Sequence, residues 1–348
     1  MTDVPELIFG GKPPRVPIRA ENLPLIAKLC RAGFHSYRKR WTKRLFKKPA
    51  RLTFDIAYHG LRLGGRGTMV MDLPDGPRRL DFNGRKVHFR NLYHDYPEGQ
   101  DPEVSAILET LLGGDRAFFD IGANWGYFAF YAATIKGYRG PIHAFEPVAE
   151  TFADLENLTG HAGLSERITC HRLALSDRDG EGRMTFDPVN TGISRLVGAN
   201  QDNSPGVESV PLARLDGLDL PAPWLLKVDV ENHELEAFRG GETLLKTEKP
   251  NLVFENWIER NDPQVTLGPL RYLEELGYVL YLPRWRFVDA EKSYIWPASV
   301  PPGQVNRRDL AFIRFTAEAR FQFEDQINAF ACHRDRVGEI TEILSNND

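Results

Sequence analysis

The sequence has few cysteines, and they lie far apart. Only three, Cys30, Cys170 and Cys332, occur among 348 residues. None belongs to a CxxC pair, so neither a zinc site nor a disulfide framework is expected. Such sparse cysteine is typical of a protein from a reducing compartment.

Long apolar runs and targeting signals are also absent from the printed sequence. No uncharged run approaches the length of a membrane span. The first residues, MTDVPELIFGGKPP, lack the basic and apolar regions of a signal peptide. We therefore expect a cytoplasmic protein. The sequence has no GxGxxG turn after an apolar run, which argues against an NAD-dependent oxidoreductase.

Charge is small in total but unevenly placed. The net charge is −4, so bulk charge predicts no nucleic-acid partner, yet residues 28–51 hold ten Lys or Arg and no acid. Residues 24–48 are predicted to form a helix with one apolar stripe and basic remaining faces. Two interpretations stay open: the helix packs on the core with a solvated basic side, or it contacts an anionic membrane surface or glycan. The second would place the protein at the inner face of the membrane.

The order of predicted elements divides the chain into four parts. Residues 1–55 are expected to form an irregular arm and the basic helix, and residues 56–114 β-hairpins and a short helix. In residues 115–316, short apolar runs alternate with helical patterns, which predicts a parallel sheet covered on both faces. Residues 180–212 interrupt this alternation as an inserted hairpin or loop. Residues 317–348 are predicted to be a C-terminal helical extension, with one or two helices over residues 317–345.

The first apolar run of that domain ends in a glycine-rich turn. Its sequence is Asp120-Ile-Gly122-Ala-Asn124-Trp-Gly126. Glycines at such a turn allow the backbone to approach a ligand where a Cβ would collide. Asp120 suits a ligand that carries a cationic amino group. The turn falls at the carboxyl edge of the sheet, where open α/β folds bind ligands.

An acid ends the second apolar run. Glu146 follows Gly122 by 24 residues, and a carboxylate at that place accepts hydrogen bonds from both ribose hydroxyls of a ribosylated cofactor. The alternative is that Glu146 caps the helix that begins near Pro147. We favour ribose binding.

A family resemblance rests on these motifs and their order. The segments FFDIGANWGYFAF, HAFEPVAETFADLENL, LALSD, LLKVDVENHELEAFRGGETLL and PNLVFEN closely resemble the FkbM family of S-adenosylmethionine-dependent methyltransferases over about residues 90–315. The resemblance implies an α/β, Rossmann-like class I methyltransferase fold: a mostly parallel seven-stranded sheet with helices on both faces, extended by N-terminal helical and β segments and a C-terminal helix. Where the family usually has glycine after K-x-D-x-E, this sequence has Asn232, which also tolerates a left-handed backbone.

The resemblance also assigns residues to the cofactor. It implies that the turn contacts the methionine half of S-adenosylmethionine, that Glu146 binds the ribose, and that two residues lie beside the adenine. Asp229 is a further expected cofactor contact. The residues so assigned are Asp120, Gly122, Asn124, Gly126, Glu146, Ala174, Leu175 and Asp229.

The acceptor side is expected at the ends of the fourth and fifth apolar runs. An alcohol needs a base or a metal ion to remove its proton, and the candidate catalytic residues are Asp229, His233 and Glu255. Asp229, Glu255 and Asn256 offer oxygen ligands for Mg²⁺ or another divalent cation. The alternative is that Asp229 only bonds the cofactor while Glu255 pairs with Lys227. Residues 190–195 are a candidate acceptor loop.

The expected activity is methyl transfer to a hydroxyl, most readily of a sugar in a glycolipid or polysaccharide. The acceptor is therefore a small molecule or a glycan, and the sequence leaves the oligomeric state open. Two other functions remain: N-methylation of a protein or small amine, because both reactions share the cofactor half, and a non-catalytic glycan-binding subunit with a vestigial cavity.

Overall fold

The computed structural model describes most of the chain. The described residues are 4, 6–25, 28, 65–92, 99–185, 196–197, 207–289, 292–297 and 308–346. Most of the basic helix predicted over residues 24–48, and all of the candidate acceptor loop 190–195, lie outside them. Within the described residues, no helix combines the length and apolar character that a membrane span requires.

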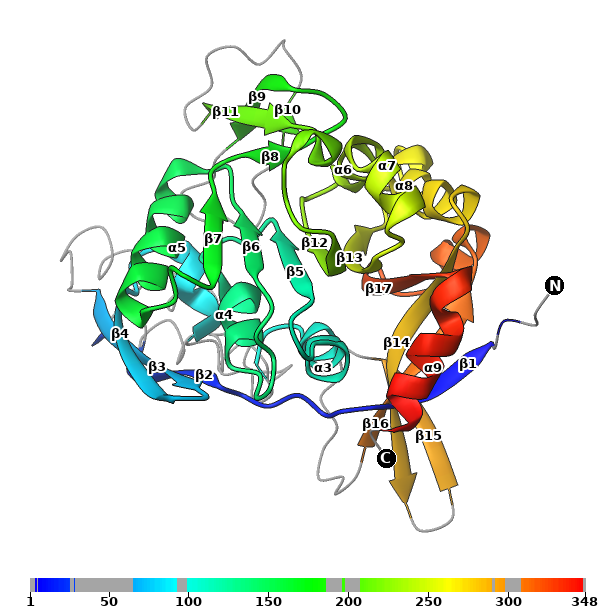
Figure 1. Ribbon diagram of the computed structural model, residues 1–348, viewed down its shortest axis with the longest axis horizontal. Helices are drawn as coiled ribbons and strands as arrows, with labels where there is room; N and C mark the ends of the chain where they lie inside the picture. The colour runs from blue at the N-terminus through cyan, green and yellow to red at the C-terminus, as the bar shows by residue number, and fades with distance from the viewer. Residues whose placement is uncertain are drawn as a thin grey trace, which may run out of the picture.

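A large mixed sheet organises the described residues (Figure 1). It has ten strands there, three more than the predicted seven. In spatial order the strands are β1 (Leu7–Gly11), β16 (Arg308–Phe315), β14 (Tyr278–Asp289), β17 (Gln326–His333), β13 (Asn251–Trp257), β12 (Pro223–Val228), β5 (Ala117–Ile121), β6 (Ile142–Phe145) and β7 (Ile168–His171), while β15 (Lys292–Pro297) pairs with β14.

The middle of this sheet is parallel. Strands β7, β6, β5, β12 and β13 are neighbours in that order and all run parallel. The chain runs outward from β5 to β7 and then returns to the other side of β5 with β12. The order of strands therefore reverses between β5 and β12, and the carboxyl ends of strands on both sides of such a reversal form a ligand-binding crevice. The predicted α/β, Rossmann-like fold is confirmed.

Strand β17 corrects the prediction for the C-terminal segment. A helix or helix pair was expected over residues 317–345, but Gln326–His333 form a strand that pairs antiparallel with both β13 and β14. The segment contains Ala329 and Ala331, which favour helix locally, whereas pairing inside the sheet decides the outcome. The predicted domain boundary at residue 316 would cut through this sheet. The predicted C-terminal helix is present as α9 (Val337–Ser345).

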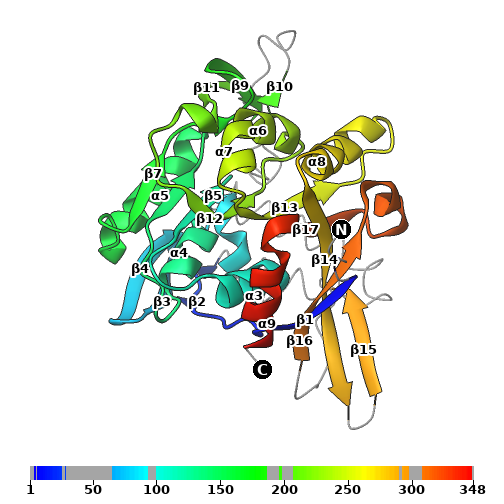
Figure 2. The ribbon, with the colours of Figure 1, turned by 45° about the vertical axis from the view of Figure 1, so that its right-hand side comes forward.

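Helices cover both faces of the sheet (Figure 2). Alternate residues of a strand point to opposite faces, so Phe118 belongs to one hydrophobic core and Phe119 to the other. The first core includes side chains from α3 (Pro102–Leu111), α4 (Tyr127–Ala133), α5 (Ala149–Ala162) and α9. The second includes side chains from α6 (Glu234–Gly240), α7 (Glu242–Thr247) and α8 (Pro263–Glu275). This two-sided burial explains the uniformly apolar strand sequences.

Two smaller sheets flank the large one. Strands β2 (Ile18–Asn22), β3 (Arg66–Leu73) and β4 (Gly76–Asn83) form the first, and β3 and β4 confirm a hairpin within the predicted residues 56–114. Strands β8 (Ala174–Leu175), β9 (Gly180–Thr185), β10 (Leu196–Val197) and β11 (Val207–Ala213) form the second, which contains the predicted insertion. The arm predicted to be irregular over residues 1–22 instead supplies β1 and β2, because open strand edges offered backbone partners that its local sequence does not reveal.

Candidate active site

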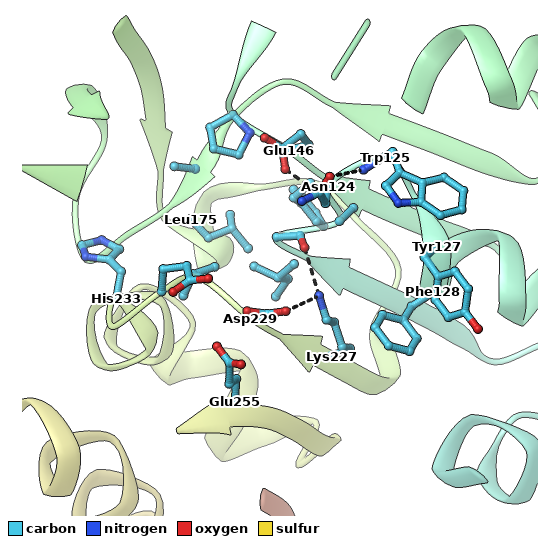
Figure 3. A pocket seen from close by; sticks show the side chains of 18 of the residues that line it. Asn124, Trp125, Tyr127, Phe128, Glu146, Leu175, Lys227, Asp229, His233 and Glu255 are labelled. Atoms are coloured by element: carbon cyan, nitrogen blue, oxygen red, sulfur yellow. Dashed lines mark hydrogen bonds and ion pairs between the residues drawn. The ribbon is translucent and has the colours of Figure 1, made fainter. Parts of the chain in front are cut away.

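A cavity of about 400 Å³ opens at the carboxyl ends of the central strands (Figure 3). Residues that follow or end β5, β6, β12 and β13 contribute to its wall, together with β8. Its volume falls in the range of ~300–1,000 Å³ that is usual for small-molecule sites. The cavity lies at the reversal of strand order, where the fold predicts ligand binding.

The glycine-rich turn after β5 forms one wall, and its glycines also allow close packing of the chain on itself. Gly122 has φ +73°, and a Cβ there would lie 1.8 Å from the carbonyl oxygen of Asp229. Gly126 has φ +95°, and its Cβ would lie 2.5 Å from Leu155. Both glycines are therefore required for contact between segments of the chain, and Gly122 in addition lines the cavity. Asn124 has φ +53° and lines the cavity, as expected of a contact residue.

Asp120 lies behind the cavity wall. Its side chain is fully buried, accepts a hydrogen bond from the Ala129 N–H at 2.9 Å, and pairs with the Lys227 ammonium at 3.3 Å. Burial raises the pKa of Asp120 above its usual value, while Lys227 opposes that shift. Neither Asp120 nor Gly126 lines the cavity. The structure therefore does not bring these two of the expected contacts to the cavity surface.

Lys227 is a site residue that was not among the predicted ones. Its ammonium donates to the Gly122 carbonyl at 2.9 Å and pairs with Asp120 at 3.3 Å and Asp229 at 3.4 Å. Burial alone would lower the pKa of Lys227, but the two carboxylates outweigh burial and raise it. The alternative pairing of Lys227 with Glu255 is not the one found. A lysine inside an otherwise apolar strand was the available signal, because a buried charge needs partners.

Glu146 caps the backbone and also faces the cavity. One carboxylate oxygen accepts from the Asn124 N–H and the other from the Val148 N–H, both at 2.9 Å. The capping alternative is thus present. Each carboxylate oxygen has a second lone pair, and Glu146 lines the cavity with 6% of its surface exposed. Burial raises the pKa of Glu146 to about 7, against the two backbone hydrogen bonds.

An apolar wall lies beyond Glu146, and His233 stands next to it. Phe145, Ala174 and Leu175 form part of this wall, which suits the predicted place of an adenine. The Nε2 of His233 lies 3.0 Å from the Ser176 hydroxyl, and its Nδ1 lies 3.5 Å from the Glu236 carboxylate. Burial lowers the pKa of His233. Both ring nitrogens therefore have partners within the protein.

Three carboxylates gather on the other side of the cavity. Ligand oxygens of Asp229, Glu231 and Glu255 all lie within 4.8 Å of one another, and Figure 3 shows the carboxylates of Asp229 and Glu255 directed toward each other. We call these three residues the acid group. Burial, and after it the charges of Asp229 and Glu231, raise the pKa of Glu255 to about 10.

Asn256 does not belong to the acid group, which corrects the predicted metal ligands. Its amide nitrogen donates to the Thr266 carbonyl at 3.0 Å, and its amide oxygen accepts from buried Arg320. Consecutive residues of a strand point to opposite faces, so Glu255 and Asn256 cannot both face the cavity. Glu231 takes the third place instead, from a turn in which Glu231 and Asn232 have φ +53° and +70°. The expectation that Asn232 tolerates a left-handed backbone is confirmed.

Further residues of this side were not predicted from the sequence. Trp257, at the end of β13, lines the cavity with 37% of its surface exposed. Gln326, on β17, also lines it and donates a hydrogen bond to Glu255. Asp101, before α3, completes this side with φ +38°. The contributions of Gln326 and Asp101 depend on strand β17 and on a loop far away in sequence, so no local pattern pointed to these two residues.

Comparisons with known proteins point to one family. The methyltransferase FkbM domain matches residues 120–280, which run from the end of β5 into β14. Hexuronic acid methyltransferase AglP of Haloferax volcanii is 27% identical over 143 residues, which cover 41% of this chain and 56% of that protein. AMB antimetabolite synthetase AmbE of Pseudomonas aeruginosa is 28% identical over 131 residues, 37% of this chain and 6% of that protein. The chain therefore spans about half of the first relative and a small part of the second.

The solved structures that resemble this chain include methyltransferases. Methyltransferase FkbM from Methylobacillus flagellatus KT is 17% identical with a TM-score of 0.36, and the match covers 59% of this chain and 47% of that one. A SAM-dependent O-methyltransferase from Thermotoga maritima is 15% identical with a TM-score of 0.30, over 76% and 81% of the two chains. Over residues 120–280 the chain is therefore similar to the methyltransferase FkbM domain.

Proposed function

We propose that this protein is an S-adenosylmethionine-dependent O-methyltransferase that acts on a hydroxyl group of a sugar. The observation that carries the proposal is the two-sided cavity: Glu146 and an apolar wall on one side, and the acid group on the other. The match of residues 120–280 to the methyltransferase FkbM domain supports the cofactor. The cavity lies where a fold of this class holds its ligand.

The cofactor side fits S-adenosylmethionine on two observations. Glu146 keeps a lone pair on each oxygen for the ribose hydroxyls, and Phe145, Ala174 and Leu175 offer an apolar surface to the adenine. When bound, S-adenosylmethionine supplies a methyl group whose transfer to the acceptor oxygen leaves the electron pair on sulfur and releases one proton from the hydroxyl. Asn124 lies on the cavity surface between these contacts and the acid group, where it can orient the cofactor.

The acceptor side has the groups that a hydroxyl needs. Asp229 can accept the hydroxyl proton at a carboxylate oxygen, and such general-base help contributes typically about 10²–10⁴-fold to a rate. Glu255 is the weaker candidate base in the empty site, because its pKa is raised to about 10 and it holds a proton at neutral pH. Lys227 holds the Asp229 carboxylate in place from behind. His233 is a weaker choice of base, because Ser176 and Glu236 already occupy its nitrogens.

Two observations favour a sugar. The relative from Haloferax volcanii is by name a hexuronic acid methyltransferase. Trp257 exposes part of its indole at the cavity, next to polar Gln326. An aromatic face pairs with the C–H groups of a sugar ring, while carboxylate and amide groups bond its hydroxyls. The acid group repels an anionic acceptor, so a neutral hydroxyl is the group that we expect to be methylated.

The test combines cofactor binding with product analysis. Calorimetry should detect S-adenosylmethionine binding to the full chain, and radiolabelled methyl should appear on oligosaccharides offered as acceptors. The product should survive alkali, because a methyl ether is stable where a methyl ester on a uronic acid is hydrolysed. Trp257→Ala should raise KM for the sugar far more than Trp257→Phe. Absence of cofactor binding, or methyl transfer only to amines, would refute the proposal.

A further inference from the structure

The acid group is more than a candidate base. We propose that Asp229, Glu231 and Glu255 together bind one hard divalent cation, of the Mg²⁺ or Mn²⁺ class, on the acceptor side of the cavity. The site itself stands on the described residues, while its role in methyl transfer rests on the proposed function. The cation would contact the acceptor hydroxyl and lower its pKa, as bound metal ions do for water.

The geometry of the acid group suits such an ion. Its residues lie at the carboxyl ends of two neighbouring parallel strands. Asp229 and Glu231 belong to the turn after β12, and Glu255 belongs to β13. All three offer ligand oxygens within 4.8 Å of one another. Carboxylate oxygens are the ligands that hard cations prefer, and Mg²⁺ usually keeps several waters beside them. The open cavity leaves room for those waters and for an acceptor oxygen.

An independent observation comes from the second oxygen of Glu255. Only 8% of the residue is exposed, and its Oε2 is buried without a hydrogen-bond partner in the described part of the chain. Its Oε1 is held by Gln326, which fixes the carboxylate in the direction of Asp229 (Figure 3). A buried carboxylate oxygen without a partner is unfavourable. A cation in the acid group would give Oε2 a ligand bond.

The charge around the cavity points to the same ion. Among the described residues that line it, Lys227 is the only Lys or Arg, against the carboxylates of Asp101, Glu146 and the acid group. The Lys227 ammonium is already taken by Asp120, Asp229 and the Gly122 carbonyl. Like-charged carboxylates this close are stabilised by a cation between them. A bound cation would also let the site accept an anionic sugar such as a hexuronic acid.

The backbone at Glu231 supports a specific role for this residue. Glu231 and Asn232 both adopt the left-handed region, at φ +53° and +70°. Residues other than glycine are strained there, and such strain persists where the surrounding structure requires it, commonly at binding sites. The turn directs the Glu231 carboxylate to the same place as Asp229 and Glu255.

The experiment titrates Mn²⁺ into the full chain, freed of cofactor, and counts free Mn²⁺ by electron paramagnetic resonance. We expect one site per chain from which Mg²⁺ displaces Mn²⁺. Glu231→Gln and Glu255→Gln should each weaken binding about tenfold or more. The matched control is Glu103→Gln. Glu103 is equally buried, has one oxygen held by Asn328 and the other unpartnered, and stands outside the acid group, so its variant should bind Mn²⁺ as the wild type does.

Absence of binding at about 1 mM Mn²⁺, which matches the weak end of the affinities of calcium-binding modules, or equal affinity in wild type and both acid-group variants, would overturn the proposal. If a variant fails to fold, anomalous diffraction from Mn²⁺-soaked wild-type crystals must show the ion between the three carboxylates, and an ion elsewhere overturns the assignment. Cofactor binding is measured in parallel. Methyl transfer that resists EDTA would refute the cation's role in the reaction but not the proposed function. Mn²⁺ binding without cofactor binding would refute the proposed function but not the cation site.

Discussion

Replacing Glu146 by alanine should weaken cofactor binding and also loosen the site. The variant loses a charged acceptor for two ribose hydroxyls, and hydrogen bonds to charged groups contribute about 1.5–3 kcal/mol each. The expected rise in Kd for S-adenosylmethionine is therefore about hundredfold or more. The substitution also leaves the Asn124 and Val148 N–H groups without their acceptor. This loss should lower the free energy of unfolding by on the order of 2 kcal/mol.

The pH dependence of cofactor affinity is a second test of the role of Glu146. The pKa of Glu146 is raised by burial to about 7, so the ionised fraction in the empty site rises from about a tenth at pH 6 to nine tenths at pH 8. If the ribose binds the ionised form, cofactor affinity should rise up to about tenfold between those pH values, and Glu146→Gln should abolish this dependence.

The same shift affects stability with a defined sign. Because the folded pKa lies above its ordinary value of 4.5, the folded state keeps a proton that the unfolded state releases as pH rises through about 4.5 to 7. This residue should therefore make the empty protein less stable across that window, by up to about 3 kcal/mol.

Calorimetry at pH 6 and pH 8, with thermal unfolding of the empty protein, measures all three effects. Glu156→Gln, on an exposed part of α5, is the control and should behave as the wild type does. An unchanged Kd in a folded Glu146→Ala variant, or an unchanged pH dependence in Glu146→Gln, would remove Glu146 from the ribose site.

Three further substitutions, one of them with a matched control variant, test the site and its support. Asp229→Ala should abolish methyl transfer while the far-ultraviolet circular dichroism stays that of the wild type, and residual turnover above about 1% would contradict a catalytic role. Gly122→Ala should fold poorly for two reasons. The new Cβ would lie 1.8 Å from the Asp229 carbonyl oxygen, and the backbone at residue 122 has φ +73°. Gly160→Ala, inside α5 with open space around it, should instead raise the free energy of unfolding by about 0.5–1 kcal/mol, and both are measured by urea denaturation. Arg320→Met should lower that free energy by about 3 kcal/mol, because buried Arg320 bonds both the side chain and the carbonyl of Asn256. A loss below about 1 kcal/mol would show that water replaces these bonds.

The parts of the fold that local patterns predicted are those with strong local signals. Helix α3 was predicted from Pro102 at its start, and the strands β5, β6, β12 and β13 from short apolar runs between helical patterns. Strand β17 was missed because its alanines and its neighbourhood of helices suggest helix, while its partners β13 and β14 lie far away in sequence. The N-terminal strands were missed for the same reason.

Local sequence rules likewise predicted only some of the site residues. Cavity-lining Asn124, Glu146 and Glu255 were found because each follows or ends an apolar strand at the edge where ligands bind. Asn256 was wrongly included although strand alternation already separates it from Glu255. Trp257 was within reach of the same alternation rule, since it shares the face of Glu255.

By itself, the sequence determined the alternation of strands and helices, the glycine turn after β5 and the similarity of residues 120–280 to the methyltransferase FkbM domain, because these depend on neighbours along the chain. Only the tertiary structure decided that β17 enters the sheet, that Lys227 neutralises Asp120 from behind the cavity, and that Glu231 completes the acid group. Those outcomes depend on backbone pairing and charge compensation between segments far apart in sequence, and the free energy of such contacts exists only once the chain has closed around them.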